Sequence, residues 1–222
     1  MPWKKSDTAI PFCKVCFSPI KNHDFVSFWD PEPLVCPKCR MAMNPRKHEE
    51  QIGKWKAVSF YVYDEMIQAM LYQLKGCGDY EMAKTFLHAY VLYLRWRYRT
   101  YVLVPAPSFK EREEARGFNQ VEAIFEELKL PFCHAVTKVD NIKQADLHWK
   151  ERQDIGKHIV WNPKANVVGK RVLFVDDLLT TGATAKAVCR LLEEHKAKEV
   201  RILVMARTPK KEVNGHQKLK IP

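Results

Sequence analysis

From residue 63 onward, apolar positions recur with periods that predict alternating helices and strands. The first stripe has the period of an amphipathic helix over residues 63–74 and consists of Met66, Ile67, Met70, Leu71 and Leu74. We expect Gly76 and Gly78 to end this helix and Asp79 to cap a second one. The apolar positions of the second helix are Met82, Ala83, Phe86, Leu87, Tyr90, Val91 and Leu94.

Three runs of consecutive apolar residues predict buried strands at 101–104, 172–175 and 200–205. A charged loop and a helix over 120–128 follow the first run, and a helix over 183–194 lies between the last two. Strands that lack inside/outside alternation and are separated by helices indicate a parallel sheet covered on both faces. The expected fold class is therefore α/β, with a doubly wound parallel sheet.

The first 45 residues lack this alternation and contain four of the seven cysteines. The cysteines form two pairs, Cys13-x2-Cys16 and Cys36-x2-Cys39, with 19 residues between them. Two such turns complete a tetrahedron around Zn²⁺, and four thiolates leave no position for a water, so a structural zinc site is predicted. The alternative is disulfides or redox-active CxxC pairs. We disfavour it because the first residues, MPWKKSD, have no apolar stretch of a secretory signal.

The predicted division of the chain is a zinc ribbon at 1–45, an α/β domain at 46–208 and a basic C-terminal tail at 209–222. A core as small as that of the ribbon needs the metal to hold it together. The tail carries Lys210, Lys211, Lys218 and Lys220 with few apolar residues. The remaining cysteines, Cys77, Cys133 and Cys189, stand beside apolar or small residues and are interpreted as packing residues.

The net positive charge of the chain is compatible with a polyanionic partner. The 222 residues carry a formal net charge of +11 and the pI is about 9.3. Residues 90–101 interleave Arg95, Arg97 and Arg99 with aromatic rings, the arrangement that holds single-stranded nucleic acid by stacking and charge. The alternative is that half of these rings belong to the core at helical spacing. An equally reasonable set of nucleic-acid contacts lies in the ribbon: Lys14, Lys21, Lys38 and Arg40. No stretch approaches 18 uncharged apolar residues, so we expect a cytoplasmic protein without membrane insertion.

The most informative stretch is VLFVDDLLTTGAT at 172–184. Asp176 and Asp177 follow the buried run, at the sheet edge where ligands of open parallel sheets bind. The next residues open a helix and can hold a phosphate with hydroxyl and backbone N–H donors: Thr180, Thr181, Gly182, Ala183 and Thr184. Carboxylates beside a phosphate need another partner, either ribose hydroxyls or a Mg²⁺ on a pyrophosphate. The lysine of a Walker A loop is missing.

This stretch resembles, at every position, the phosphoribosyl pyrophosphate (PRPP) signature of type I phosphoribosyltransferases. The resemblance implies that 180–184 hold the 5-phosphate and that Asp176 and Asp177 contact the ribose 2- and 3-hydroxyls, with Mg²⁺ accompanying PRPP. The alternative for the same residues is an ordinary strand, turn and helix with an acidic cap.

Residues 70–79 (MLYQLKGCGD) and 104–120 (VPAPSFKEREEARGFNQ), with Thr137, Gln144, Leu147 and Arg152, resemble the ComF family. Its members join an N-terminal zinc ribbon to a phosphoribosyltransferase-like domain. Membership implies a role in DNA uptake during natural transformation, with single-stranded DNA and other competence proteins, including a helicase, as partners. The alternative is an active phosphoribosyltransferase of nucleotide or base salvage, in which pyrophosphate leaves and a nitrogen nucleophile attacks C1.

The resemblance also indicates which other residues are expected to contact the ligand. Arg116, in the family-specific RGFNQ run, is expected to neutralise pyrophosphate and joins Asp176 and Asp177 as a catalytic candidate. Ser108 is a secondary candidate for ligand contact because it follows the strand that ends at the same sheet edge. Arg112 is another candidate, and the alternative for it is a solvated loop in which it forms ion pairs with neighbouring glutamates. Gln144 and Arg152 fall where the hood of related enzymes lies.

The chain departs from the family pattern at two places. Asp154 stands where members usually have Asn. Lys196, Ala197 and Lys198 stand where members commonly have Gly before the last strand.

Overall fold

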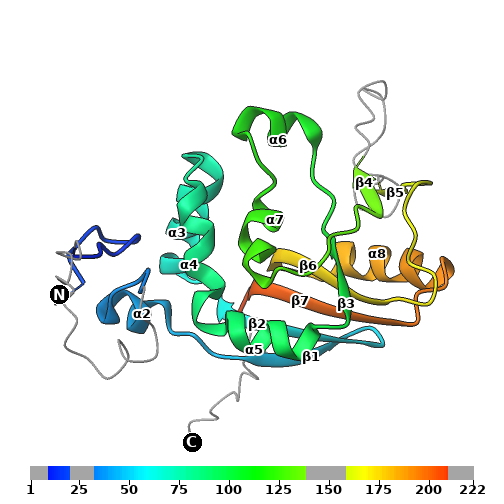
Figure 1. The fold of residues 1–222 in the computed structure, drawn as a ribbon, viewed down its shortest axis with the longest axis horizontal. Coiled ribbons are helices and arrows are strands. Elements are labelled where there is room, and N and C mark those ends of the chain that lie inside the picture. The colour runs from blue at the N-terminus through cyan, green and yellow to red at the C-terminus, as the bar shows by residue number, and fades with distance from the viewer. Residues whose placement is uncertain (1–9, 21–32, 139–158, 210–222) are drawn as a thin grey trace, which may run out of the picture.

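A computed structural model describes residues 10–20, 33–138 and 159–209. Its centre is a five-stranded sheet of order β1-β2-β7-β6-β3 (Figure 1). The strands are β1 (His48–Ile52), β2 (Trp55–Val62), β3 (Tyr101–Pro105), β6 (Arg171–Leu179) and β7 (Glu199–Arg207). All neighbours pair in parallel except β1, which is antiparallel to β2. The expected parallel α/β sheet is therefore confirmed, with an antiparallel strand added at one edge.

Helices cover both faces of the sheet, so the doubly wound architecture is also confirmed (Figure 1). On one face lie α3 (Glu65–Gly76), α4 (Tyr80–Leu87), α5 (Val91–Tyr98) and α7 (Gln120–Phe125), and on the other α8 (Ala183–Glu194). Alternate residues of β6 point to the two layers: Leu173 and Val175 pack with the first, Val172 and Phe174 with α8. Over the described ranges, no helix has the length and apolar content needed to cross a bilayer.

Two aspartates start the helices that precede β3. Asp64 Oδ1 accepts a hydrogen bond from the Ile67 amide at 3.0 Å, and Asp79 Oδ1 accepts one from the Met82 amide at 3.3 Å. The predicted cap of the second helix is confirmed, and α3 begins two residues later than its apolar stripe predicted. The second helix is not continuous, because the 3₁₀ turn η1 (His88–Tyr90) separates α4 from α5.

Several elements differ from the sequence-based expectation. The expected charged loop after β3 contains a helix, α6 (Lys110–Arg116), which ends at Gly117 with φ of 84°. Helix α7 continues as the 3₁₀ turn η2 (Glu126–Leu128). The hairpin β1–β2 was not predicted from the sequence.

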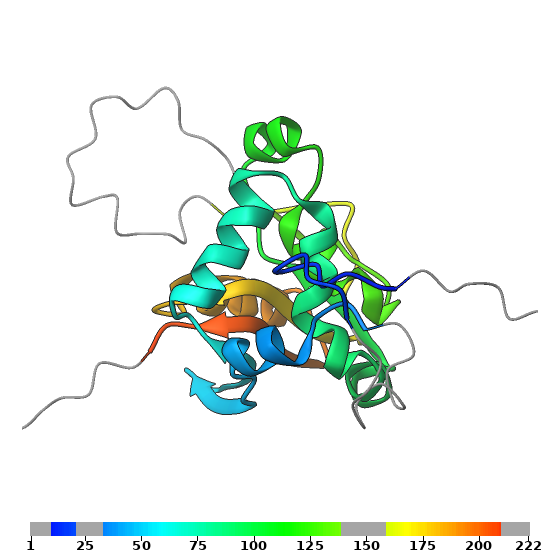
Figure 2. The same cartoon turned by 90° about the vertical axis from the view of Figure 1, so that its left-hand side faces the viewer.

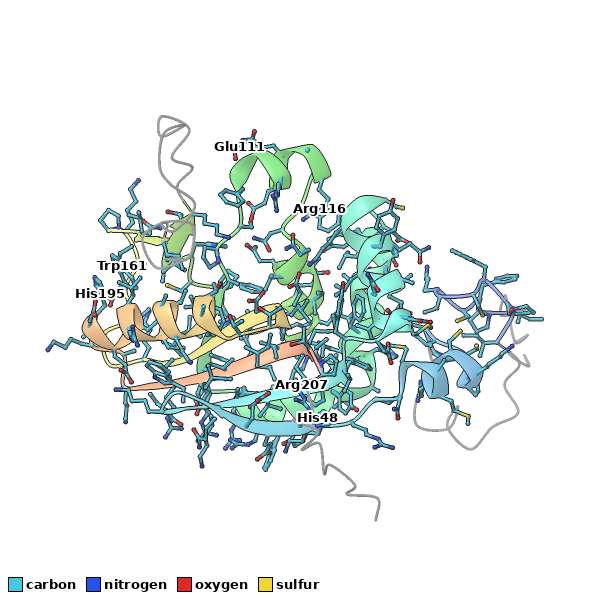
Figure 3. All side chains as sticks on the ribbon, turned by 180° about the vertical axis from the view of Figure 1, so that it is seen from behind. His48, Glu111, Arg116, Trp161, His195 and Arg207 are labelled. Carbon is cyan, nitrogen blue, oxygen red and sulfur yellow. The ribbon has the colours of Figure 1, made fainter. Side chains whose placement is uncertain are left out.

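A second hairpin, of β4 (Val136–Lys138) and β5 (Ile159–Trp161), was also not expected. The Trp161 ring stacks on His195 at the end of α8, with ring centroids 3.6 Å apart (Figure 3). This stack fixes the small hairpin to the end of α8 that is remote from the residues following β6.

The N-terminal segment lies against α3 and α4 (Figure 2). It contains α2 (Pro37–Met43) and a single bridge between Phe12 and Pro19. Lys14 forms an ion pair with Glu81 of α4 at 3.6 Å. Buried residues of the segment, among them Met43, belong to the same hydrophobic cluster as the core of α3 and α4.

Candidate functional site

The four N-terminal cysteines converge on one point. The sulfur atoms of Cys13, Cys16, Cys36 and Cys39 all lie within 4.8 Å of one another. The Sγ atoms of Cys16 and Cys36 are 3.8 Å apart, which is too far for a disulfide. Four sulfurs placed about 2.3 Å from a central Zn²⁺ in a tetrahedron would lie about 3.8 Å apart. The spacing in the sequence therefore becomes a cluster that fits a tetrahedral metal ion.

Backbone amides point at this cluster as they do in thiolate metal sites. The Cys36 amide donates to Cys13 Sγ at 3.3 Å, and the Cys39 amide donates to Cys36 Sγ at 3.5 Å. Hydrogen bonds with Ser18 lower the pKa of the exposed Cys16 thiol to about 6. Burial raises the pKa of the Cys36 and Cys39 thiols. These buried thiols become thiolates most readily when a cation binds among them.

The acidic pair lies where β6 extends beyond its neighbour. Strand β3 ends at Pro105, opposite Val175, while β6 continues to Leu179 and pairs only with β7. Asp176 and Asp177 therefore stand within the strand, at an edge open on the β3 side. The sequence placed them just after the strand, and the difference comes from the pairing of β6 with β7.

The two carboxylates have different surroundings. The Asp177 amide donates to Asp176 Oδ1 at 2.8 Å. Burial, together with the neighbouring charge of Asp177, raises the pKa of Asp176 well above its usual range. The Asp177 side chain is 8% exposed and accepts an ion pair from Lys75 Nζ at 2.5 Å. A hydrogen-bond donor or a cation would therefore stabilise the ionised form of Asp176, whereas Asp177 already has a cation beside it.

The turn after β6 leads into the N-terminus of α8. Gly182 has φ of 73° and is the N-cap of α8. The Ala183 amide donates to Thr181 Oγ1 at 3.3 Å, and Thr180 and Thr181 are exposed. The first turn of α8 has no acidic residue and its N-cap, Gly182, has no side chain, so the amides that follow Ala183 and the positive end of the helix dipole are available to a phosphate. Thr184 is half-buried in that first turn.

A hydrogen-bonded network joins Arg116 to the acidic pair. Arg116 Nε donates to the carbonyl of Lys75 at 3.2 Å, and its Nη1 donates to Gln120 Oε1. Gln120 Nε2 in turn donates to Asp177 Oδ2 at 3.4 Å. The structure thus brings Arg116 and Asp177 into one network. It also adds Lys75 and Gln120, to which the sequence assigned no role although both lie in the family-like segments.

The secondary candidates are placed less uniformly. The Ser108 hydroxyl donates to the Glu113 carboxylate, which also accepts from Asn119 Nδ2 at 2.5 Å. Arg112 is exposed, with its guanidinium carbon 5.1 Å from the ring centre of Phe109. Gln144 and Arg152 lie outside the described residues.

The remaining cysteines do not share one role. Cys189 is a fully buried residue of α8, and this burial raises the pKa of its thiol to about 12. Cys133 is half-buried. Cys77 is exposed at the end of α3, so its interpretation as a packing residue is wrong.

Residues 90–101 divide between core and surface. The rings of Tyr98 and Tyr101 are 4% exposed and pack edge-on in the core. Trp96 is 66% exposed, with the guanidinium of Arg99 5.6 Å from its ring centre. Arg95 is held by the Glu127 carbonyl at 2.6 and 2.8 Å.

Beside the exposed face of α5 lies a cleft of about 310 Å³. Its lining includes the cations Lys47, Lys56, Arg97 and Arg201, the carboxylates Glu49 and Glu50, and the rings of Tyr93 and Tyr98.

Comparison with known proteins places this geometry in a family. The phosphoribosyl transferase domain family matches residues 114–220. The competence protein ComFC of Bacillus subtilis (strain 168) is 35% identical over 154 residues, 68% of this chain and 63% of that protein. The competence protein F of Haemophilus influenzae is 24% identical over 218 residues, 92% of this chain and 88% of that protein. The chain thus spans slightly less than two thirds of the length of the Bacillus relative.

A solved hypoxanthine phosphoribosyltransferase of Staphylococcus aureus aligns with 59% of this chain and 65% of its own, at 15% identity and a TM-score of 0.39. The phosphoribosyltransferase type of the fold rests instead on the matching domain family. The chain is thus similar to competence proteins, in one relative over nearly its full length, and it matches the phosphoribosyl transferase domain, which together support the ComF family.

Proposed function

We propose that this ComF-like chain binds the phosphoribosyl group of PRPP or a related phosphorylated ribose. The 5-phosphate would lie on the turn that contains Thr180, Thr181, Gly182, Ala183 and Thr184, and the ribose hydroxyls would donate to Asp176 and Asp177. A bound Mg²⁺ would supply positive charge to the diphosphate oxygens of PRPP. The observation that carries the proposal is the junction of an open acidic edge on β6 with the uncapped N-terminus of α8.

Charge explains why both halves are needed. Two carboxylates repel a phosphate, while the N-terminus of α8 attracts it. A phosphorylated sugar satisfies both groups at once, because its hydroxyls reach the carboxylates and its phosphate reaches the helix. Hydroxyl donors would also stabilise the ionised form of Asp176, whose pKa burial raises.

The experiment is calorimetric titration with PRPP and Mg²⁺, and separately with ribose 5-phosphate. The double variant Asp176→Asn, Asp177→Asn keeps the side-chain volume and removes the charges. A hydrogen bond to a charged group contributes about 1.5–3 kcal/mol, so we expect affinity to fall at least tenfold. The exposed Glu194→Gln is the matched control. Unchanged affinity in the double variant would overturn the proposal.

We further propose that the four-cysteine cluster holds a structural zinc ion, as its sulfur geometry supports. The relatives are named for competence, and we propose that this chain likewise acts in DNA uptake, binding single-stranded DNA. The α5 face supports DNA binding because the exposed Trp96 ring has the guanidinium of Arg99 5.6 Å from its centre. Arg97 of the same helix lines the cleft, which holds four cations against two carboxylates.

The DNA proposal is tested by fluorescence anisotropy with a labelled thymidine oligonucleotide over a series of salt concentrations. Phosphate contacts release counterions, so the logarithm of the association constant should fall linearly with the logarithm of salt. Trp96→Ala and Arg97→Ala should each weaken binding, and only the arginine variant should reduce the salt slope. Arg190→Ala, an equal charge change on α8, is the control. Binding that neither α5 variant alters would refute this location.

Catalysis by the same site is the second candidate function, because the acidic edge and phosphate turn are both formed. Positioning and stabilisation of developing charge would then drive departure of pyrophosphate from C1. Release of pyrophosphate from PRPP only when a particular base is present would establish it. PRPP binding without turnover over a panel of purine and pyrimidine bases would leave ligand binding as the function.

A further inference from the structure

A band of cationic side chains follows the edge of the sheet at which β3, β6 and β7 begin. Arg171, the first residue of β6, pairs with Tyr101 of β3 on one side and with Glu199 of β7 on the other. Figure 1 shows the starts of β6 and β7 beside the end of α8, at the opposite end of these strands from their arrowheads. We call this the amino-terminal edge, and the basic band along it consists of Lys170, Arg171, Lys196, Lys198 and Arg201.

Three lysines of the basic band are brought together by the backbone of two loops. The Gly169 amide donates to the Lys196 carbonyl at 2.9 Å, and the Lys198 amide donates to the Lys170 carbonyl at 2.8 Å. All three lysine side chains are exposed, and within the described part of the chain none of them forms an ion pair with a carboxylate. Their charges are therefore available to an anion from outside the chain.

Two arginines connect these lysines to α5 and to the cleft beside it. Arg171 Nη1 donates to Thr100 Oγ1 at 3.4 Å, and Thr100 lies two residues after the end of α5. Arg171 and Arg201 share the carboxylate of Glu199, at 3.3 and 2.6 Å, and Arg201 also lines the cleft. One carboxylate between two guanidinium groups leaves a net positive charge, so the basic band continues the cations of the cleft.

The chain has a lysine in this band at a position where the backbone favours glycine. Lys196 has φ of 63°, a left-handed conformation that is strained for a residue with a Cβ. Strained backbone of this kind gathers at functional sites, where the side chain is needed despite its cost in stability. The exposed ammonium group of Lys196 is the feature that glycine would not supply at this turn.

We propose that the basic band binds the phosphate backbone of single-stranded nucleic acid and extends the proposed DNA surface from α5 to the end of α8. This inference rests on the proposed function for the position of the strand on α5. An ammonium group on a flexible stem acts as a point charge, which suits a chain of repeated phosphates. Phosphate contacts carry no base information, so binding along the band should not depend on sequence.

The basic band lies at the opposite end of β6 from the proposed phosphoribosyl site. Strand β6 runs from Arg171 to Leu179, and its nine residues span about 26 Å. The turn proposed to hold the phosphate follows Leu179. The strand of DNA and the sugar ligand would therefore bind at the same time, and saturating ribose 5-phosphate should leave DNA bound. Displacement of the DNA would indicate a shared site and overturn the proposal.

The test is fluorescence anisotropy with a labelled oligothymidine of about 16 nucleotides, the upper site size of single-strand-binding folds. The double variant Lys170→Gln, Lys198→Gln removes two phosphate contacts. We expect about twentyfold weaker binding at about 0.1 M salt and a salt slope reduced by about 1.4, at about 0.7 for each contact. Lys186→Gln with Arg190→Gln, an equal charge change on α8, is the matched control. Wild-type affinity and slope in the lysine variant would overturn the proposal.

Lys196→Gly separates lost contacts from lost stability. Glycine relieves the left-handed backbone, so we expect a higher Tm together with about fivefold weaker binding at about 0.1 M salt, the loss of one phosphate contact. Opposite changes in Tm and in affinity exclude partial unfolding as the cause of weaker binding. A higher Tm with wild-type affinity would refute the role of Lys196.

The α5 variants Trp96→Ala and Arg97→Ala distinguish this inference from the proposed function. Weaker binding in these variants alone would sustain the α5 site and refute the band. Weaker binding in the lysine variant alone would sustain the band and refute the α5 site. Retained DNA binding with lost binding to vesicles that contain phosphatidylglycerol would make the band a membrane contact and refute the proposal.

Discussion

Ile52 occupies the space that a side chain at Gly182 would need. A Cβ built on Gly182 would lie 2.8 Å from Cγ2 of Ile52, and Gly182 has φ of 73°. Ile52 is the last residue of β1 and is 9% exposed, so it has little freedom to move. The turn proposed to hold the phosphate is therefore shaped by a hairpin more than a hundred residues earlier in the chain.

Gly182→Ala should destabilise the protein and weaken ribose 5-phosphate binding. The left-handed backbone alone costs a residue with a side chain about 1–2 kcal/mol, and the contact with Ile52 adds to it. Urea unfolding and calorimetry would measure the two effects.

The contact with Ile52 can be isolated by a double-mutant cycle. Ile52→Ala should lower the free energy of unfolding by itself. In the Ile52→Ala protein, Gly182→Ala should lower the free energy of unfolding by about 1 kcal/mol less than in the wild type, because Cγ2 of Ile52 is gone. Additive free energies of unfolding would show that only the backbone conformation requires glycine.

Asp176→Asn should stabilise the folded protein at neutral pH. The folded-state pKa of Asp176 is raised by burial and by Asp177, so folding opposes its ionisation. Wild-type stability should therefore fall as pH rises from the usual aspartate range toward the raised pKa, and the variant should lack this fall. Urea unfolding midpoints across this pH window provide the measurement.

The same variant should lose affinity for the phosphoribosyl ligand, because the carboxylate is the proposed acceptor for a ribose hydroxyl. Glu194→Gln, at an exposed site, should change neither the pH profile nor the affinity. An Asp176→Asn protein with the wild-type pH profile would show that another group causes the dependence.

Lys196→Gly should stabilise the end of α8. Lys196 has φ of 63°, and its amide donates to the Glu193 carbonyl at 2.9 Å while the Ala197 amide donates to the Leu192 carbonyl at 3.0 Å. A left-handed backbone of this kind favours glycine, which has no Cβ. Glycine removes the strain of the left-handed backbone in the folded state, and this gain should exceed the cost of the greater conformational freedom of the unfolded chain. The free energy of unfolding should therefore rise by about 0.5–1 kcal/mol.

The control for Lys196→Gly is Lys198→Gly, two residues later. Lys198 is exposed and is not among the described residues with positive φ, so glycine should destabilise there. Thermal unfolding of both variants gives the comparison, and equal effects would contradict the backbone explanation.

Sequence patterns predicted those features that depend only on residues close together in the chain. The cap at Asp79, the helix α8 and the cysteine cluster follow from spacing alone. Pairing between distant strands was not predictable: β6 extends to Leu179 because β7 lies beside it, and no local pattern marks that limit.

The hairpin β1–β2 and helix α6 were missed for a related reason. The residues HEEQI of β1 contain no apolar run that predicts a strand, yet they pair with the apolar β2. The residues KEREEAR lie in the predicted charged loop, yet they form a short helix. Lys75 was missed because its ion pair joins α3 to β6, which are a hundred residues apart. Contacts of this kind arise only when the chain has folded.

Removal of zinc should lower the stability of the whole chain and not of the N-terminal segment alone. Cys13, Cys36 and Cys39 belong to the same buried cluster as Met82 and Phe86 of α4, so the proposed metal site shares a core with the α/β domain. Metal analysis should find one zinc per chain, and chelation should lower the Tm of the single unfolding transition.

Cys39→Ser should abolish zinc binding, because three thiolates and a buried hydroxyl no longer satisfy the ion. Cys77→Ser, at the exposed cysteine outside the cluster, is the matched control and should retain both zinc and Tm. Two separate transitions after chelation, with the second at the wild-type Tm, would contradict the shared core. In that case the contact between Lys14 and Glu81 would join two units that unfold independently.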